Sequence, residues 1–289
     1  MVAAAVYYSE TQNQQRILLG TLGGDTSIAL SINDAGVVVG EASTTAAIIK
    51  LKWGWTYRMR HAFIWTREKG MEDLGTLGGE ESSALAINNS GMVVGVADTK
   101  NGGSHAFLWT RERGMEDLGT LGGDYSSAIA INSSGLVAGT ADTKNGESHA
   151  FIWSREKGME DLGTLGGGTC RAWGIDEAGQ VFRISNDMEG WHTFVWRPNK
   201  CREEIPMENF KCKFANSTIN RAGHKVGSIK IPAPWWMRAW NAMGEKLGLP
   251  QKYLFWAGDS SRQEAVLWLA RVPPPESDTE SQDWRSLFQ

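Results

Sequence analysis

The 289-residue sequence predicts an all-β fold, and three observations carry this prediction. Short sequence elements recur along the chain, most often every 44 residues; each recurring unit contains four strand-like runs; and no segment shows apolar residues at helical spacing over 10 or more residues. Four antiparallel strands in about 40–45 residues is the period of a propeller blade. We therefore expect a β-propeller of about five to six four-stranded blades, with a β-solenoid and an open or incomplete array as the alternatives.

Three elements keep their spacing through most of the chain. The first Gly of Leu-Gly-Thr-Leu-Gly-Gly stands at Gly20, Gly75, Gly119 and Gly163. The polar residue of Ile-Asn-x-x-Gly stands at Asn33, Asn88, Asn132, Asp176 and Asn220. The element His-Ala-Phe-aliphatic-Trp ends at Trp65, Trp109 and Trp153, and a variant of it ends at Trp196. One longer spacing, of 55 residues, reflects 11 extra residues between Gly40 and His61.

Within one unit, glycine-containing breaks separate the predicted strands, which are Met71–Leu77, Ser83–Ile87, Met92–Ala97 and His105–Thr110. Asn101-Gly102 precedes the fourth of them, and Asn-Gly favours a tight hairpin turn because both residues tolerate positive φ. A lone four-stranded blade cannot bury both of its faces, so the copies must stack.

The two ends of the chain are expected to meet. The segment Ala3–Tyr8 stands where a His-Ala-Phe-x-Trp strand would precede Leu19-Gly20, so the chain begins in mid-repeat. We expect this segment to complete a blade begun by C-terminal strands and so to close the ring, which hides the sheet edges.

Three strings recur together and in the same order: His-Ala-Phe-(Leu/Ile)-Trp, Gly-Met-x-Asp-Leu-Gly-Thr-Leu-Gly-Gly and Ala-Ile-Asn-x-x-Gly-x-Val-x-Gly. This combination resembles the bacterial HAF repeat. It stands almost intact at His61–Gly95, His105–Gly139 and His149–Gly179, and departs from the pattern at Asp176 and Thr193. The resemblance implies an extracellular or cell-envelope bacterial protein with no established catalytic activity. The first residues lack the basic region of a signal peptide, which leaves a cytoplasmic protein as the alternative.

One propeller domain is expected over residues 1–271, with regular repeats over 18–196 and degenerate repeats over 197–271. The Pro-rich and acidic tail 272–289 is expected to be disordered. The formal net charge of −4 gives no reason to expect a nucleic-acid partner. No apolar run approaches the roughly 18 residues that a membrane-spanning helix needs. A disulfide between Cys201 and Cys212 is left open by the sequence.

The repeated polar and aromatic residues are interpreted as structural. Each of the histidines His61, His105, His149 and His192 is expected to form a hydrogen bond within its blade, with Asp98, Asp142, Ser104 or Ser148 as the partner. The repeated Trp is expected to pack between blades. In Met-Glu-Asp, adjacent carboxylates point to opposite faces of a strand, so they cannot form a glycosidase pair by themselves. No metal, cofactor or catalytic motif is predicted.

Function is expected where the repeat breaks and at exposed turns. The irregular aromatics are Trp53, Trp55 and Tyr57 in the insertion, and Trp235 and Trp236 after two prolines. Aromatics in loops suit stacking on sugars or insertion into a partner, with burial at an irregular closure as the alternative. The equivalent turns Asp98–Gly102 and Asp142–Gly146 add Asp98, Asn101, Asp142 and Asn145 as candidate contacts.

Near-identical copies are typical of a multivalent binder, whereas an enzyme needs unlike residues that converge. We therefore predict a non-enzymatic binding or scaffold module for a carbohydrate or protein partner at a cell surface. The alternative is a carbohydrate-active enzyme whose site lies within residues 187–268, with Asp187, Glu189 and Asp259 as candidate acids.

Overall fold

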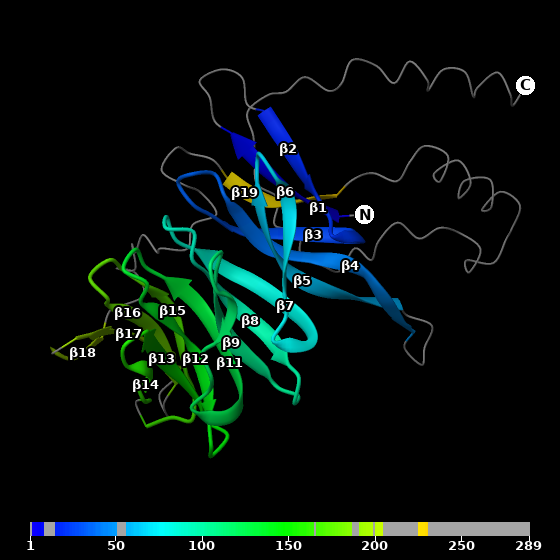
Figure 1. The fold of residues 1–289 in the computed structure, drawn as a ribbon. Coiled ribbons are helices and arrows are strands. Elements are labelled where there is room, and N and C mark those ends of the chain that lie inside the picture. The colour runs from blue at the N-terminus through cyan, green and yellow to red at the C-terminus, as the bar shows by residue number, and fades with distance from the viewer. Residues whose placement is uncertain are drawn as a thin grey trace, which may run out of the picture.

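The computed structural model describes residues 2–8, 15–50, 56–164, 166–186, 191–198, 200–204 and 225–230, which form β-strands joined by turns (Figure 1). These residues contain no helix, so the predicted all-β class is confirmed, and none of their segments is a helix that could span a membrane. The predicted tail 272–289 and most of the degenerate repeats over 197–271 lie outside the described residues.

Each regular unit forms one four-stranded antiparallel sheet. The first such sheet consists of β7 (Gly78–Ile87), β8 (Val93–Thr99), β9 (Ser104–Thr110) and β10 (Gly114–Asp117). The next consists of β11 (Gly122–Ile131), β12 (Val137–Thr143), β13 (Ser148–Ser154) and β14 (Gly158–Asp161). One parallel bridge, between Ser104 and Tyr125, joins the two sheets. The four predicted runs are thus strands, but Met71–Leu77 belongs to the sheet before the other three.

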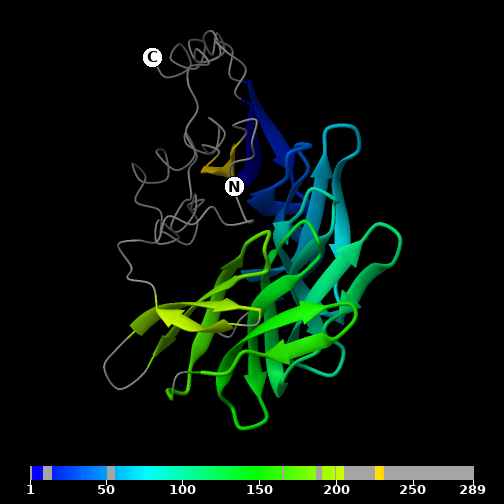
Figure 2. The same cartoon turned by 90° about the vertical axis from the view of Figure 1, so that its left-hand side faces the viewer.

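Two further sheets flank the regular pair. One contains β3 (Gly23–Ile32), β4 (Val38–Lys50), β5 (Thr56–Thr66) and β6 (Gly70–Gly75). The other contains β15 (Cys170–Ile175), β16 (Val181–Asn186), β17 (Trp191–Arg197) and β18 (Lys200–Glu204). The 11 extra residues lengthen the β4–β5 hairpin, whose outermost described pair is Lys50 with Thr56. The sheets follow one another in chain order along a curved path (Figure 2).

Strands from both ends of the chain form a composite sheet of β19 (Lys225–Lys230), β1 (Val2–Tyr8) and β2 (Gln15–Gly20). The N-terminal strand therefore pairs with a strand of the degenerate repeats, and closure of a ring stays a prediction. Its register equals that of a regular sheet: Ala5 lies opposite Gly227, as Phe107 lies opposite Gly95. None of the described sheets closes on itself, so the propeller is not established by this arrangement.

The core lies between successive sheets. Residues of β4, β5 and β6 pack against residues of the following sheet, and this cluster comprises Val39, Ala62, Ile64, Leu74, Ala84, Ile87, Val93, Ala97 and Phe107. Equivalent positions 44 residues later, such as Ala128 and Phe151, form the next interface. Trp109 and Trp153 each pack against one of these clusters, which confirms that the repeated Trp packs between sheets. Burial of apolar area at about 25 cal/mol per Å² makes this stacking the main source of stability.

A β-bulge at the same place in each first strand shapes these interfaces. In β7 the pairing shifts between Ala84, opposite Gly95, and Ala86, opposite Val94. A side chain at Gly95 would collide with the carbonyl oxygen of Ser83 and with the ring of Phe107. The repeated glycine is therefore required by the close approach of the bulged backbone.

Candidate functional site

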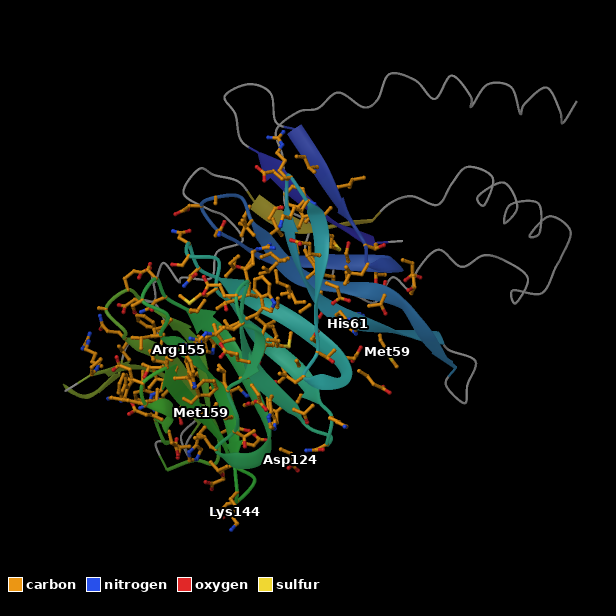
Figure 3. All side chains as sticks on the ribbon, viewed as in Figure 1. Met59, His61, Asp124, Lys144, Arg155 and Met159 are labelled. Atoms are coloured by element: carbon orange, nitrogen blue, oxygen red, sulfur yellow. The ribbon has the colours of Figure 1, made fainter. Side chains whose placement is uncertain are left out.

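Two of the predicted binding turns are well defined by the structure. They join β8 to β9 and β12 to β13, and their tips Lys100–Gly102 and Lys144–Gly146 are exposed. Figure 3 labels Lys144 at the end of its hairpin. Asn101 and Asn145 are thus accessible to a ligand.

The two predicted aspartates of these turns have a different role. Asp98 and Asp142 are half-buried, and each accepts a hydrogen bond from the serine that opens the next strand. The donor–acceptor distances are 2.7 Å for Ser104 Oγ to Asp98 Oδ1 and 2.6 Å for Ser148 Oγ to Asp142 Oδ1. The aspartates shape the turns, which leaves contact with a ligand to the tips.

The aromatic candidates are not brought together among the described residues. Trp53, Trp55, Trp235 and Trp236 lie outside the described ranges, as do the candidate acids Asp187, Glu189 and Asp259. Tyr57 belongs to β5, where its backbone pairs with Ile49. Cys212 also lies outside these ranges, so its pairing with Cys201 stays open.

Three of the repeated histidines form hydrogen bonds to carboxylates within their sheets. His61 Nδ1 lies 2.8 Å from Asp73 Oδ2, and the equivalent distances are 2.8 Å for His105 to Asp117 and 2.9 Å for His149 to Asp161. The predicted hydrogen bond inside each blade is confirmed for these three histidines. The expected partners were wrong, because Asp98 and Asp142 bind serines and the true partner lies on the last strand of the same sheet.

The aspartate of each pair also holds a turn. Asp117 Oδ1 accepts a hydrogen bond from the backbone N–H of Gly119 at 2.8 Å, and Asp73 does the same for Gly75 at 2.7 Å. Both glycines have positive φ, of 77° and 76°. The dyad therefore fixes the connection that leads from one sheet to the next.

The glutamate of Met-Glu-Asp links neighbouring sheets. Arg111 Nη2 lies 2.9 Å from Glu72 Oε2, and Arg155 Nη2 lies 2.8 Å from Glu116 Oε2. The hydrogen bond from Arg111 lowers the pKa of Glu72, and that from Arg155 lowers the pKa of Glu116. The two carboxylates of the motif thus serve different partners, as the alternation of a strand requires.

A ladder of asparagines joins the turns after the first strands. Asn33 Nδ2 donates to the carbonyl oxygen of Asn88 at 3.2 Å, Asn88 Nδ2 to that of Asn132 at 3.0 Å, and Asn132 Nδ2 to that of Asp176 at 3.1 Å. Each Oδ1 also accepts from two backbone N–H groups of its own turn, as Asn88 does from Ser90 and Met92. A carboxylate has no N–H to donate, so this ladder cannot continue in the same way from Asp176.

A second layer of bonds comes from buried serines. Ser82 Oγ accepts from Ala62 N at 2.8 Å and donates to the carbonyl oxygen of Gly75, both in the preceding sheet. Ser126 makes the equivalent bonds to Ala106 and Gly119. Sequence reasoning missed this serine and the linking role of the asparagine. Aligning the copies would have exposed the signal, since Ser27, Ser82 and Ser126 are spaced as the glycines are.

The repeated polar side chains therefore hold sheets together, and they do not converge on one point. In the described part of the chain, no group of three or more His, Cys, Asp or Glu side chains is placed to hold a metal ion. A comparison with models of protein families found no match, and neither did a comparison with curated protein sequences. Any function must accordingly be argued from the residues themselves.

Proposed function

We propose that the described sheets are blades of a HAF-type β-propeller and that the composite sheet is the blade that closes its ring. Two features support this. The composite sheet has the register of a regular blade, and its Val2 forms a parallel bridge to Thr26, equivalent to the bridge from Ser104 to Tyr125. A closed ring covers the faces that the first and last sheets of an open array expose.

Ring closure is tested by deleting residues 1–10 and following amide hydrogen exchange. In a ring, the composite blade has two neighbours, so the deletion should speed exchange in β3–β6 and in β15–β18 alike. Faster exchange confined to β3–β6 would mean that the array is open.

We further propose that the protein is a non-enzymatic binding or scaffold module that contacts a carbohydrate or a protein at a cell surface. The observation that carries this proposal is that most of the repeated polar side chains bind within the protein, whereas those at the turn tips are exposed. Histidines, arginines, asparagines and serines are engaged within and between sheets, whereas the Lys-Asn-Gly tips at Asn101 and Asn145 are exposed on neighbouring sheets. Equivalent exposed groups on a rigid scaffold suit a ligand that itself repeats.

A repeating ligand would engage both tips at once. Each tip offers an amide, which both donates and accepts hydrogen bonds, beside a lysine ammonium. One such contact is weak, but a second contact on the same ligand becomes intramolecular and raises avidity by about 10²–10⁴. Polysaccharides and repetitive protein surfaces meet this requirement.

A bacterial-envelope polysaccharide and glycan array tests the proposal, run on protein shown by circular dichroism to be folded and β-rich. Binding should fall by at least about tenfold when either Asn101→Ala or Asn145→Ala is introduced, because each change removes one of two linked contacts. Ser133→Ala, on a turn at the other end of the strands, is the matched control. If the folded protein binds no saccharide on the array, the carbohydrate form of the proposal is excluded. A pull-down would then test a protein partner.

A further inference from the structure

The chain contains two Asn-Gly steps, Asn101-Gly102 and Asn145-Gly146, and each stands at the tip of a hairpin. All four residues are exposed. Within the part of the chain that the structure describes, neither asparagine side chain has a hydrogen-bond partner. These two amide groups are therefore open to solvent and free to reorient.

The other asparagines of the two regular sheets are held in place. Asn88 and Asn132 are buried, and their side chains belong to the ladder between sheets. Asn89 is exposed, but its Oδ1 accepts from the backbone N–H of Asp34 at 3.0 Å and its Nδ2 donates to Asp34 Oδ2 at 2.8 Å. None of these three asparagines precedes a glycine. In these sheets, exposure, an unbound amide and a following glycine thus coincide at the two tips alone.

The glycine at each tip leaves its backbone nitrogen open to approach. Gly102 and Gly146 have φ of 84° and 80°. Apart from chain neighbours, no atom lies within 4 Å of the place that a β-carbon would take on either glycine. A glycine also has no side chain of its own to shield this nitrogen. Cγ of the preceding asparagine can therefore reach the nitrogen when the turn opens.

We propose that Asn101 and Asn145 are sites of spontaneous deamidation. At the first tip, the backbone nitrogen of Gly102 gives its proton to solvent and attacks Cγ of Asn101. A bond from this nitrogen to Cγ forms, the bond from Cγ to Nδ2 breaks, and Nδ2 leaves as ammonia after taking a proton from solvent. Water then adds to one carbonyl carbon of the resulting succinimide ring and opens it, which yields aspartate or isoaspartate. The sequence of steps consumes water, releases ammonia and needs no oxidant or reductant.

The structure also orders the two tips. The attacking nitrogen is released when its hydrogen bond across the turn opens, and this bond is longer at the first tip. Gly102 N lies 3.3 Å from Thr99 O, whereas Gly146 N lies 3.0 Å from Thr143 O. The ordinary range of N–H···O distances ends at about 3.2 Å. Gly103, with φ of 82°, adds conformational freedom to the first turn. Asn101 should therefore convert before Asn145.

Conversion changes what each tip offers to a ligand. An amide donates and accepts hydrogen bonds, whereas the carboxylate that replaces it only accepts them. Each conversion also adds a negative charge beside the lysine of the tip, so the formal net charge falls from −4 to −6 when both tips have reacted. This consequence rests on the proposed function: a module that binds through Asn101 and Asn145 loses its ligand as the tips convert.

Peptide-mapping mass spectrometry of the full chain tests the modification. The folded protein is incubated at mildly alkaline pH in water enriched in heavy oxygen, which labels those conversions that occur before digestion. Asn101 and Asn145 should convert at least about tenfold faster than Asn89, because their amides are unbound and a glycine follows each of them. Conversion at the tips no faster than at Asn89 would overturn the proposal. Faster conversion at Asn145 than at Asn101 would overturn the order of the tips.

The variant Asn101→Gln/Asn145→Gln locates the reaction. Glutamine keeps an amide at each tip, but its longer side chain would have to close a larger ring. On anion exchange, the incubated parent should split into species that carry one or two additional negative charges, whereas the variant should stay a single species. The matched control is Asn89→Gln, which should split as the parent does. A double variant that gains charge at the parent's rate would place the reaction elsewhere and overturn the proposal.

The array described above separates this inference from the proposed function. Incubated parent should lose saccharide binding in step with conversion, whereas the incubated Asn101→Gln/Asn145→Gln variant should bind as it does when fresh. Conversion of both tips without loss of binding would overturn the tips as the binding site and leave the modification established by mass. Absence of conversion in a parent that binds saccharide would overturn the modification and leave the binding site standing.

Discussion

Arg183 Nη1 lies 3.9 Å from Cys170 Sγ, and both residues depart from the pattern of the other sheets. At the equivalent positions one repeat earlier stand Ser126 and Gly139. Ser126 Oγ donates to the carbonyl oxygen of Gly119, whereas in the last sheet Arg183 Nη1 donates to the carbonyl oxygens of Gly163 at 3.1 Å and Leu162 at 2.7 Å. A long donor on the second strand has thus replaced a short donor on the first.

This replacement predicts strong coupling between the two positions. Arg183 is fully buried, so Arg183→Gly alone should cost about 2–4 kcal/mol by leaving a cavity and carbonyl groups without their donor. Cys170→Ser/Arg183→Gly recreates the serine–glycine pair and should recover about 1–3 kcal/mol of that loss. A urea double-mutant cycle measures the coupling. Strictly additive effects would show that the two changes are unrelated.

The asparagine ladder predicts that two substitutions at one position differ. Asn88→Asp keeps the acceptor of its turn but loses the donor to Asn132, at a cost of about 1 kcal/mol or more. Asn88→Ala also loses both acceptor bonds of the turn and should cost about 2–4 kcal/mol. Urea unfolding measures both, with the exposed Asn145→Ala within about 0.5 kcal/mol of the parent as the control. An Asn88→Asp variant as stable as the parent would show that the hydrogen bonds of the ladder do not contribute to stability.

The sequence was sufficient to predict the strands and their stacking, but not the bonds between sheets. Period-two alternation and a 44-residue repeat are local signals, and Trp109 and Trp153 pack against the clusters between sheets as expected. The hydrogen bonds of Ser82 and Asn88 join residues that are 20 and 44 positions apart in the sequence. Such bonds can be predicted only when the way in which the sheets stack is already known.

The histidine partner was missed for a related reason. The strand that carries Asp73 was assigned to the start of one unit, but it is β6, the last strand of the preceding sheet. Connections are short on both sides of this strand, so spacing alone does not decide which sheet it joins. Once β6 is placed beside β5, Asp73 and His61 are brought together, 2.8 Å apart.

The ion pairs between sheets predict a pH-dependent term in stability. Hydrogen bonds from Arg111 and Arg155 hold the pKa values of Glu72 and Glu116 below the ordinary value of 4.5. A group whose pKa is lower in the folded state stabilises the fold above its unfolded pKa, and this contribution disappears as the pH falls through the folded value. Both pairs are exposed at the surface, so each should contribute only about 0.2–1 kcal/mol.

Glu72→Gln/Glu116→Gln isolates this term. The variant should be less stable than the parent at pH 7 and equal to it well below pH 4.5, as measured by urea unfolding at both pH values. In 1 M NaCl the difference at pH 7 should shrink, because salt screens exposed charges. A difference that persists at low pH would assign the loss to packing of the glutamate side chains.

The histidine–aspartate dyads predict one tautomer in three places. A carboxylate only accepts hydrogen bonds, so Nδ1 of His61, His105 and His149 must carry the proton that binds Asp73, Asp117 and Asp161. Neutral forms of these rings should therefore be protonated at Nδ1 and bare at Nε2. Long-range ¹H–¹⁵N correlation spectra of histidine-labelled protein distinguish the two nitrogens directly.

Substitution of a single aspartate identifies the signal and tests its cause. Asp117→Ala should release the ring of His105 from this tautomer while the signals of His61 and His149 stay unchanged, since each dyad lies within its own sheet. Asn145→Ala, at an exposed tip, should alter none of the three. A bare Nδ1 in the parent would mean that the carboxylate does not hold the ring, and the turn at Gly119 would then depend on Asp117 alone.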